Sequence, residues 1–184
     1  MRQDALVLET TLYGRYERLR DLLELAIQVR AEISPPSGVD RIGLRYIDEI
    51  RVPTDNGDAR ITWSNWVDGS LLGPAHLGDK LGLAATASQG LTVFGGPEDR
   101  ALVLRYGLQD DPAVASTPQL RRATPPPGPL FVLDIDSFWQ PGADVPEMTA
   151  ATVLGVVDQL HQPVREMFES LITERLREEV LRSA

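Results

Sequence analysis

The segment from Arg41 to Val52 constrains the fold most, because its side chains alternate along the chain. One parity is mostly apolar and the other mostly polar: Ile42, Leu44, Tyr46, Ile50 and Val52 against Arg41, Gly43, Arg45, Glu49 and Arg51. A period of two is typical of a strand with one buried face. The segment therefore predicts a strand with a layer of structure on one side and polar groups on the other.

Asp48 is an exception to this pattern, since it falls on the apolar parity while Ile47 falls on the polar one. A carboxylate on a buried face needs a partner or an altered pKa. We expect a β-bulge here, because it would turn Asp48 outward and would also explain Ile47.

The remaining elements favour an antiparallel sheet. Further strands are predicted at residues 5–12, 89–94, 101–108 and 129–139. The second and third of these form a hairpin, and the last is apolar on both faces at its start, so it should be central. Amphipathic helices are predicted at residues 15–32 and 148–181.

The C-terminal helix contains Pro163, which should kink or split it near His161. The whole chain, residues 1–184, is predicted to form a single α+β domain. Its curved antiparallel β-sheet packs on an amphipathic helix and on a long C-terminal helix kinked near Pro163.

Other segments are less regular. Asn56-Gly57 predicts a turn at residues 53–58, and the proline-rich segment 110–128 predicts a surface loop. The segment 61–67 is either a short strand or irregular, with Trp63 and Trp66 expected in the core. Residues 71–83 predict a short helix broken by glycine and proline.

Composition excludes several classes of protein. The chain has 184 residues, a net charge of -9 and no cysteine, which removes disulfides, iron–sulfur clusters, zinc–thiolate sites and thiol catalysis. An acidic chain is a poor partner for a phosphate backbone, so nucleic-acid binding is not expected. Neither a signal peptide nor a membrane span is recognisable, and a cytoplasmic protein is expected.

Common catalytic motifs are missing from the sequence as well. It contains no G-x-G-x-x-G or Walker A segment and no serine in a nucleophile-elbow context. His76 and His161 are isolated and do not predict a metal site; for His161 a core or interface role is expected. No cofactor is predicted.

The strongest candidate site is a cluster of arginine and aspartate on two strands. Arg41 and Arg45 share one face of the first, and Asp134 and Asp136 share a face of the second. If the strands are neighbours, Arg45 can bind a carboxylate in a bidentate pair. Three interpretations stay open: a structural ion-pair lattice, a patch that binds an anion through arginine or a divalent cation through aspartate, and a catalytic carboxylate pair.

One short pattern occurs twice. Residues 42–46 read I-G-L-R-Y, and residues 102–106 read L-V-L-R-Y. Two equivalent strands of a duplicated unit would produce this recurrence, and so would chance, because strands draw on few residue types.

The segments R-I-G-L-R-Y-I (41–47) and L-D-I-D-S-F (133–138) resemble the signature of a sporadically distributed family of uncharacterised bacterial proteins. Tyr13 ahead of a helix, Leu160-His161, and Phe168 followed by I-T-E (172–174) fit the same pattern, so the resemblance covers most of the chain. It implies no activity, but a sporadic distribution implies mobile loci such as phage defence or toxin–antitoxin pairs. Family members often carry an additional segment ahead of the first strand, whereas Met1 lies close to that strand here. A functional site built on the additional segment is therefore not expected in this chain.

The favoured hypothesis is a non-enzymatic α+β protein that binds a protein partner or forms a homo-oligomer, within a defence or toxin–antitoxin locus. An alternative is a small-molecule-binding protein with a cavity between the sheet and the C-terminal helix. A second alternative is a metal-assisted enzyme that uses Asp134 and Asp136, and the sequence does not decide whether any catalysis occurs. The candidate ligand-binding residues are Arg41, Arg45, Tyr46, Asp134 and Asp136.

Overall fold

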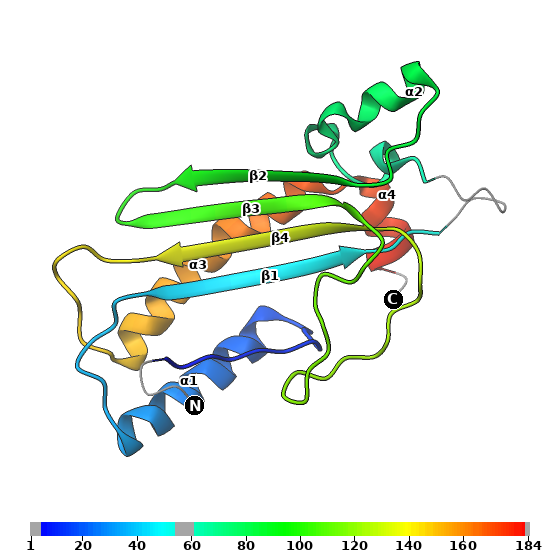
Figure 1. Cartoon of the computed structure of the whole chain (residues 1–184). Coiled ribbons are helices and arrows are strands. Elements are labelled where there is room, and N and C mark those ends of the chain that lie inside the picture. Colours follow the sequence, from blue (N-terminus) through cyan, green and yellow to red (C-terminus); the bar gives the residue numbers. More distant parts are fainter. Residues whose placement is uncertain (1–4, 54–60, 183–184) are drawn as a thin grey trace.

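The chain folds around one four-stranded sheet (Figure 1). Its strands are β1 (Ile42–Ile50), β2 (Ser88–Gly95), β3 (Arg100–Gln109) and β4 (Leu130–Trp139). They lie in the order β1-β4-β3-β2, and each neighbouring pair is antiparallel. This computed structural model describes residues 5–53 and 61–182. The predicted antiparallel sheet, with the last strand at its centre beside a hairpin, is confirmed.

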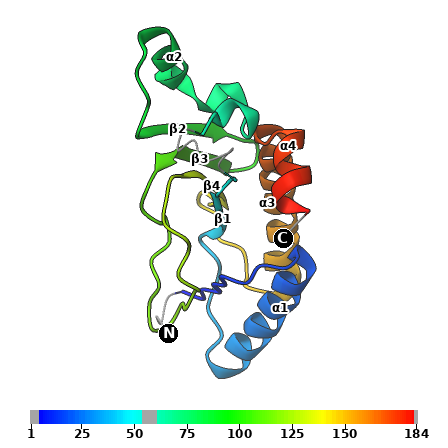
Figure 2. The same ribbon diagram turned by 90° about the vertical axis from the view of Figure 1, so that its right-hand side faces the viewer.

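Helices cover one face of the sheet, and a long loop lies on the other (Figure 2). The long helix α3 (Ala150–Leu171) packs across β1 and β4, and α1 (Tyr16–Ile33) packs beside α3. The two predicted helices are therefore confirmed as the layer on which the sheet rests. We call the side of the sheet away from α3 the open face.

Apolar side chains from every second strand position fill the space between the sheet and the helices. One core cluster joins α1, β1 and α3 through Ile27, Ile42, Leu44, Val153, Leu154, Val157 and Leu160. A larger cluster lies under β3 and β4 and includes Leu102, Leu104, Phe131, Leu133, Ile135, Val164 and Leu171. Burial of these residues supplies the main free energy that holds the layers together.

The N-terminal segment differs from the prediction. Residues 6–12 form no strand, and only Ala5 makes an isolated bridge. Leu6 packs against the core cluster of α1, β1 and α3, whereas Val7 and Leu12 are exposed, so the segment lacks the continuous buried face that favours regular pairing. It runs instead alongside β1 and leads into α1 (Figure 1).

The C-terminal helix is interrupted later than expected. The split near His161 does not occur, because α3 continues through Pro163 with Leu160 and Val164 anchored in the core on either side of it. The helix ends at Leu171, where Ile172 pairs with Val67 as an isolated bridge. A short helix, α4 (Glu174–Leu176), and a π-helical turn, η4 (Arg177–Leu181), follow.

Residues 61–87 contain short helical turns: η1 (Trp63–Asn65), η2 (Gly69–Leu71), η3 (Gly73–Leu77) and α2 (Gly78–Leu81). Trp63 and Trp66 are buried, as predicted. The predicted turn around Asn56-Gly57 lies outside the described residues. None of the helices in the described part of the chain is long and apolar enough to cross a membrane.

Candidate functional site

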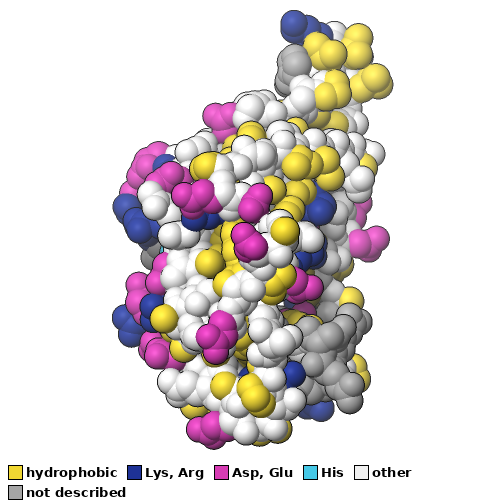
Figure 3. All heavy atoms as spheres, turned by 90° about the vertical axis from the view of Figure 1, so that its left-hand side faces the viewer, with side chains coloured by type: hydrophobic (Ala, Val, Ile, Leu, Met, Phe, Trp, Pro, Cys, Tyr) yellow, Lys and Arg dark blue, Asp and Glu magenta, His cyan; other side chains and the backbone are white. Residues whose placement is uncertain are grey.

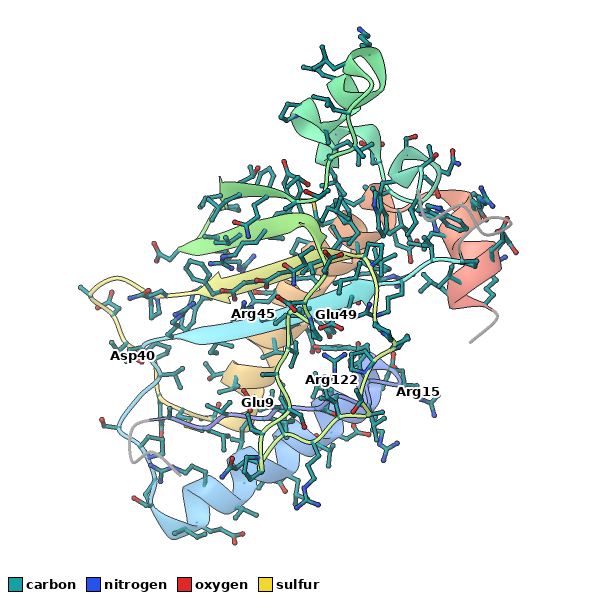
Figure 4. The ribbon with its side chains drawn as sticks, turned by 45° about the vertical axis from the view of Figure 1, so that its right-hand side comes forward. Glu9, Arg15, Asp40, Arg45, Glu49 and Arg122 are labelled. Carbon is teal, nitrogen blue, oxygen red and sulfur yellow. The ribbon has the colours of Figure 1, made fainter. Side chains whose placement is uncertain are left out.

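The predicted arginine–aspartate pair forms on the open face. In the β1–β4 register Arg45 stands opposite Asp136, and Ile47 stands opposite Asp134. The Arg45 Nε and Nη2 atoms each donate to one carboxylate oxygen of Asp134, both at 2.7 Å. The bidentate geometry predicted for Arg45 is therefore confirmed, with the diagonal neighbour Asp134 as the acceptor. Figure 4 shows Arg45 on β1.

The repeated pattern places a second arginine on the other side of the same carboxylate. β3 flanks β4 opposite β1, and Arg105 of β3 stands directly across from Asp134. The Arg105 Nη1 atom lies 3.7 Å from Asp134 Oδ2. The buried Asp134 is thus enclosed by two guanidinium groups, and hydrogen bonding to it raises the pKa of Arg45 above the usual arginine value.

Of the other predicted site residues, Asp136 stands directly opposite Arg45, and its charge contributes to the raised pKa of Arg45, whereas Arg41 and Tyr46 make other contacts. The Arg41 guanidinium lies 4.6 Å from the ring centroid of Phe138, a cation–π contact. Asp136 shares the open face with Arg45, and among the described residues no ion pair joins it. Tyr46 points to the helix side, where its hydroxyl hydrogen-bonds that of Tyr13 at 3.0 Å. Arg45, Asp134 and Asp136 therefore gather on the open face, whereas Tyr46 points to the other side of the sheet.

The hydrogen bonds from Arg45 to Asp134 oppose the hypothesis that Asp134 and Asp136 bind a divalent cation. Both oxygens of Asp134 already accept short hydrogen bonds from Arg45, so a divalent cation would have to displace a guanidinium group. Within residues 5–53 and 61–182, no three His, Asp or Glu side chains gather in a way that could hold a metal ion. The arrangement favours a structural ion-pair role for Asp134.

A shallow groove of about 540 Å³ lies on the open face beside this pair. Its lining includes Gln89, Leu91, Arg105, Pro112, Val132 and Asp134. The groove is thus floored by β2, β3 and β4 and walled by the start of the long loop. It lies on the side of the sheet away from α3, not between the sheet and the C-terminal helix.

The long loop, residues 110–129, is held against the end of β1 by hydrogen bonds to Glu49. Arg122 Nη1 and Nη2 donate to the two Glu49 carboxylate oxygens at 2.8 and 2.7 Å, and the Val114 N–H donates to Glu49 at 3.1 Å (Figure 4). These contacts lower the pKa of Glu49, chiefly through Arg122. Sequence reasoning missed this pair, because its members are far apart along the chain; the polar parity of Glu49 was the only signal.

The helix-facing side holds a carboxylate that contradicts a prediction. The register from Ile42 to Ile50 is unbroken, so the β-bulge expected at Asp48 is wrong. Asp48 stays on the helix-facing side opposite Leu133, and burial raises its pKa to about 6. Ile47 points to the open face instead. Unbroken hydrogen bonding with β4 outweighs the cost of this one side chain.

A polar cluster joins α1 to α3. The Tyr16 ring stacks on His161 with 3.7 Å between the ring centroids, and its hydroxyl donates to Asp158 at 2.5 Å. Arg20 also binds Asp158 through two hydrogen bonds, at 2.9 and 3.1 Å. Burial lowers the pKa of His161, because partial removal from water disfavours the charged ring.

The two terminal strands of the sheet, β1 and β2, differ in their charge and surroundings. The N-terminal segment runs alongside β1 without pairing with it (Figure 1), and it hydrogen-bonds the long loop through Thr11 Oγ1 and the Arg121 carbonyl at 2.8 Å. The β2 edge has no partner strand in the described structure. Leu91 and Val93 of β2 are 62% and 60% exposed. The sheet therefore ends in a charged edge strand, β1, which contains Arg45 and Glu49, and in an uncharged edge strand, β2.

β2 also lacks the sequence and backbone features that usually prevent strand addition at a free edge. It contains no charged residue and no proline, and its pairing with β3 is continuous, without a bulge. The uncharged stretch extends from Leu81 to Pro97. This run was the sequence signal for the edge, and sequence reasoning did not use it.

A protruding arm, residues 69–87, precedes β2 and contains η2, η3 and α2. In Figures 1 and 2 it extends past the β2 edge, and hydrophobic side chains gather on it at the top of Figure 3. Leu81 and Leu83 are 68% and 61% exposed. The exposed leucines of the arm and the apolar side chains of β2 together form an apolar surface at one side of the molecule, and the exposed Lys80 adjoins it.

Comparison of this chain with protein-family models, with curated proteins and with solved structures found no match. The resemblance of the R-I-G-L-R-Y and L-D-I-D-S-F segments to a sporadic bacterial family therefore stays a prediction.

Proposed function

We propose that this chain is a protein-binding module that accepts an extended segment of a protein partner at the free edge of β2. The observation that carries the proposal is the unprotected edge itself: an uncharged strand with exposed Leu91 and Val93 at the end of the sheet order. Such an edge offers a row of unpaired backbone donors and acceptors to an added strand.

Alternating side chains would give the interaction its specificity. Leu91 and Val93 project on the open face, in line with Arg105 and Val103 of β3, whereas Phe94 projects on the helix side. A strand added to β2 would extend both faces, with every second side chain directed toward the groove beside Leu91. Backbone pairing would supply affinity, and these alternate contacts would select the partner.

The chemistry of the open face supports binding rather than catalysis. Asp134 is committed to Arg45, and Arg105 lies against the same carboxylate. A strand-binding surface needs no reactive group. The resemblance to a sporadic bacterial family favours a partner from a phage-defence or toxin–antitoxin locus, and that origin is part of the proposal.

Site-specific photocrosslinking tests this function. A photoreactive amino acid replaces Val93 in the full chain, and it replaces Leu25 of α1, which is 57% exposed, as a control of similar exposure. We expect position 93 to crosslink to one discrete protein in the native cell, identified by mass spectrometry of the linked peptide. Position 25 should not give that product.

A charge placed on the edge strand supplies the matched loss of binding. Thr92→Lys, combined with the photoreactive group at position 93, should abolish the crosslink, because lysine on an edge strand opposes strand addition. Absence of any crosslinked protein from position 93, or a product that survives Thr92→Lys, would contradict the proposed function.

A further inference from the structure

We infer that the strand bound at this edge is β2 of a second copy, so that two chains form a two-fold dimer with one continuous sheet. The inference rests on the proposed function and names its partner. Three features of the described residues support it. These are the absence of charge along the β2 edge, the position of the arm, and the exposed apolar side chains of the arm and of β2.

Charge favours a second copy at this surface and not elsewhere. The chain has a net charge of -9, so two copies repel each other overall, and 24% of its residues are charged. From Leu81 to Pro97 there is no charged residue at all. Two copies can therefore meet along β2 without placing any charge of that segment opposite its equivalent.

The position of the arm makes the contact reciprocal. The arm enters β2 at Ser88 and extends past the edge of the sheet (Figures 1 and 2). In an antiparallel pair of β2 strands, the start of one strand lies beside the end of the other. The arm of each copy, with Leu81 and Leu83, therefore comes beside Phe94 of the other copy. A two-fold axis makes each of these contacts twice.

The apolar surface fits this occupant because the chain carries both halves of it. A partner must offer an uncharged strand to pair with β2 and an apolar surface to cover Leu81 and Leu83. β2 and its own Phe94 meet both needs, since Phe94 is exposed on the helix side, at the end that faces the other arm. Exposed apolar area of this kind marks an interface.

The test uses the full chain, which has no cysteine. Thr92 is exposed and lies next to the middle of β2, so a two-fold axis that passes at position 92 brings the two Thr92 residues together. Thr92→Cys should form a disulfide-linked dimer on mild oxidation. Gln28→Cys, at an exposed position of α1, is the matched control and should stay largely monomeric under oxidising, denaturing electrophoresis.

Light scattering coupled to gel filtration supplies a second measurement. The wild-type chain should have twice the monomer mass, and the variant Leu91→Lys/Val93→Lys should have the monomer mass. Leu25→Lys, a charge added at a similarly exposed leucine of α1, should keep the dimer. Circular dichroism shows whether each variant is folded; if the double variant is unfolded, the Thr92→Cys result decides.

A monomeric wild type together with a Thr92→Cys variant that forms no disulfide would overturn the inference, as would a dimer unaffected by the two lysines. These outcomes differ from failure of the proposed function. If position 93 crosslinks to another protein while the chain is monomeric, only the identity of the partner is wrong. If it crosslinks to nothing, a second copy included, both proposals fail.

Discussion

Asp48 lies on the helix-facing side of β1, where burial raises its pKa from 3.8 to about 6. A folded-state pKa above the unfolded value means that the folded chain binds more protons between these values. The resulting destabilisation is absent below about pH 4 and complete above about pH 6. Asp48 therefore weakens the fold near neutral pH and does not weaken it in mild acid.

Replacement of Asp48 by asparagine should remove this penalty. We expect Asp48→Asn to raise the free energy of unfolding near pH 7.5 by up to about 3 kcal/mol, and to have little effect near pH 4. Urea unfolding of both chains at the two pH values measures the difference. An equal effect at both values would show that the carboxylate is not held in an unfavourable environment.

Arg45 differs from Asp48 in that its charge stabilises the fold, because it pairs with the buried carboxylate of Asp134. Arg45→Ala leaves the buried Asp134 with only Arg105 at 3.7 Å, so unfolding should require about 1–3 kcal/mol less free energy. Arg45→Lys should fall between, because an ammonium group keeps the charge but not the bidentate geometry. Chemical denaturation measures the free energy of unfolding of these variants. Arg18→Ala, at an exposed position of α1, is the control. An unchanged midpoint for Arg45→Ala would disprove the structural role of the ion pair.

At the scale of elements, the long loop depends on contacts that it makes with β1. Arg122 and Glu49 supply two short hydrogen bonds, and Arg51 Nη1 donates to the Gly128 carbonyl at 3.0 Å. A loop rich in proline has little regular pairing of its own, so side-chain contacts fix its position. The wall of the groove therefore depends chiefly on one glutamate at the end of β1.

Arg122→Ala should release this loop while the sheet stays intact. Hydrogen exchange followed by mass spectrometry should show faster exchange for residues 113–124, and little change in β3 and β4. Arg121→Ala, the adjacent and exposed residue, is the matched control. Slow exchange of the loop in the Arg122→Ala chain would show that other contacts hold it.

At the scale of the whole molecule, the two edges of the sheet have different environments. The β1 edge carries charged side chains such as Arg45 and Glu49, with the N-terminal segment running alongside, while β2 has no charged residue and meets the arm at one end (Figure 1). A free, uncharged edge normally promotes association. Pairing of two copies along it would cover the apolar side chains of both arms and strands, and would explain why this edge carries no protective charge.

The helices and most strands could be predicted because their signals are local. The alternation at 41–52, the hairpin around Pro97 and the apolar spacing of the C-terminal helix each report the face that is buried. The Arg45 pair was predictable for the same reason, since two polar parities on neighbouring strands must meet. The predicted N-terminal strand was wrong because, past Leu6, its apolar side chains are exposed, and propensity without a continuous buried face does not make a strand.

Sequence alone determined the class of fold, the central position of β4 and the two arginine-bearing strands, since periodicity encodes which side chains avoid water. Only the tertiary structure decided that Arg45 and Arg105 share Asp134, that Asp48 stays inside, that Glu49 holds Arg122 and that β2 ends the sheet. These features depend on strand order and register. Both are fixed by the packing of the entire chain, so no local pattern can specify them.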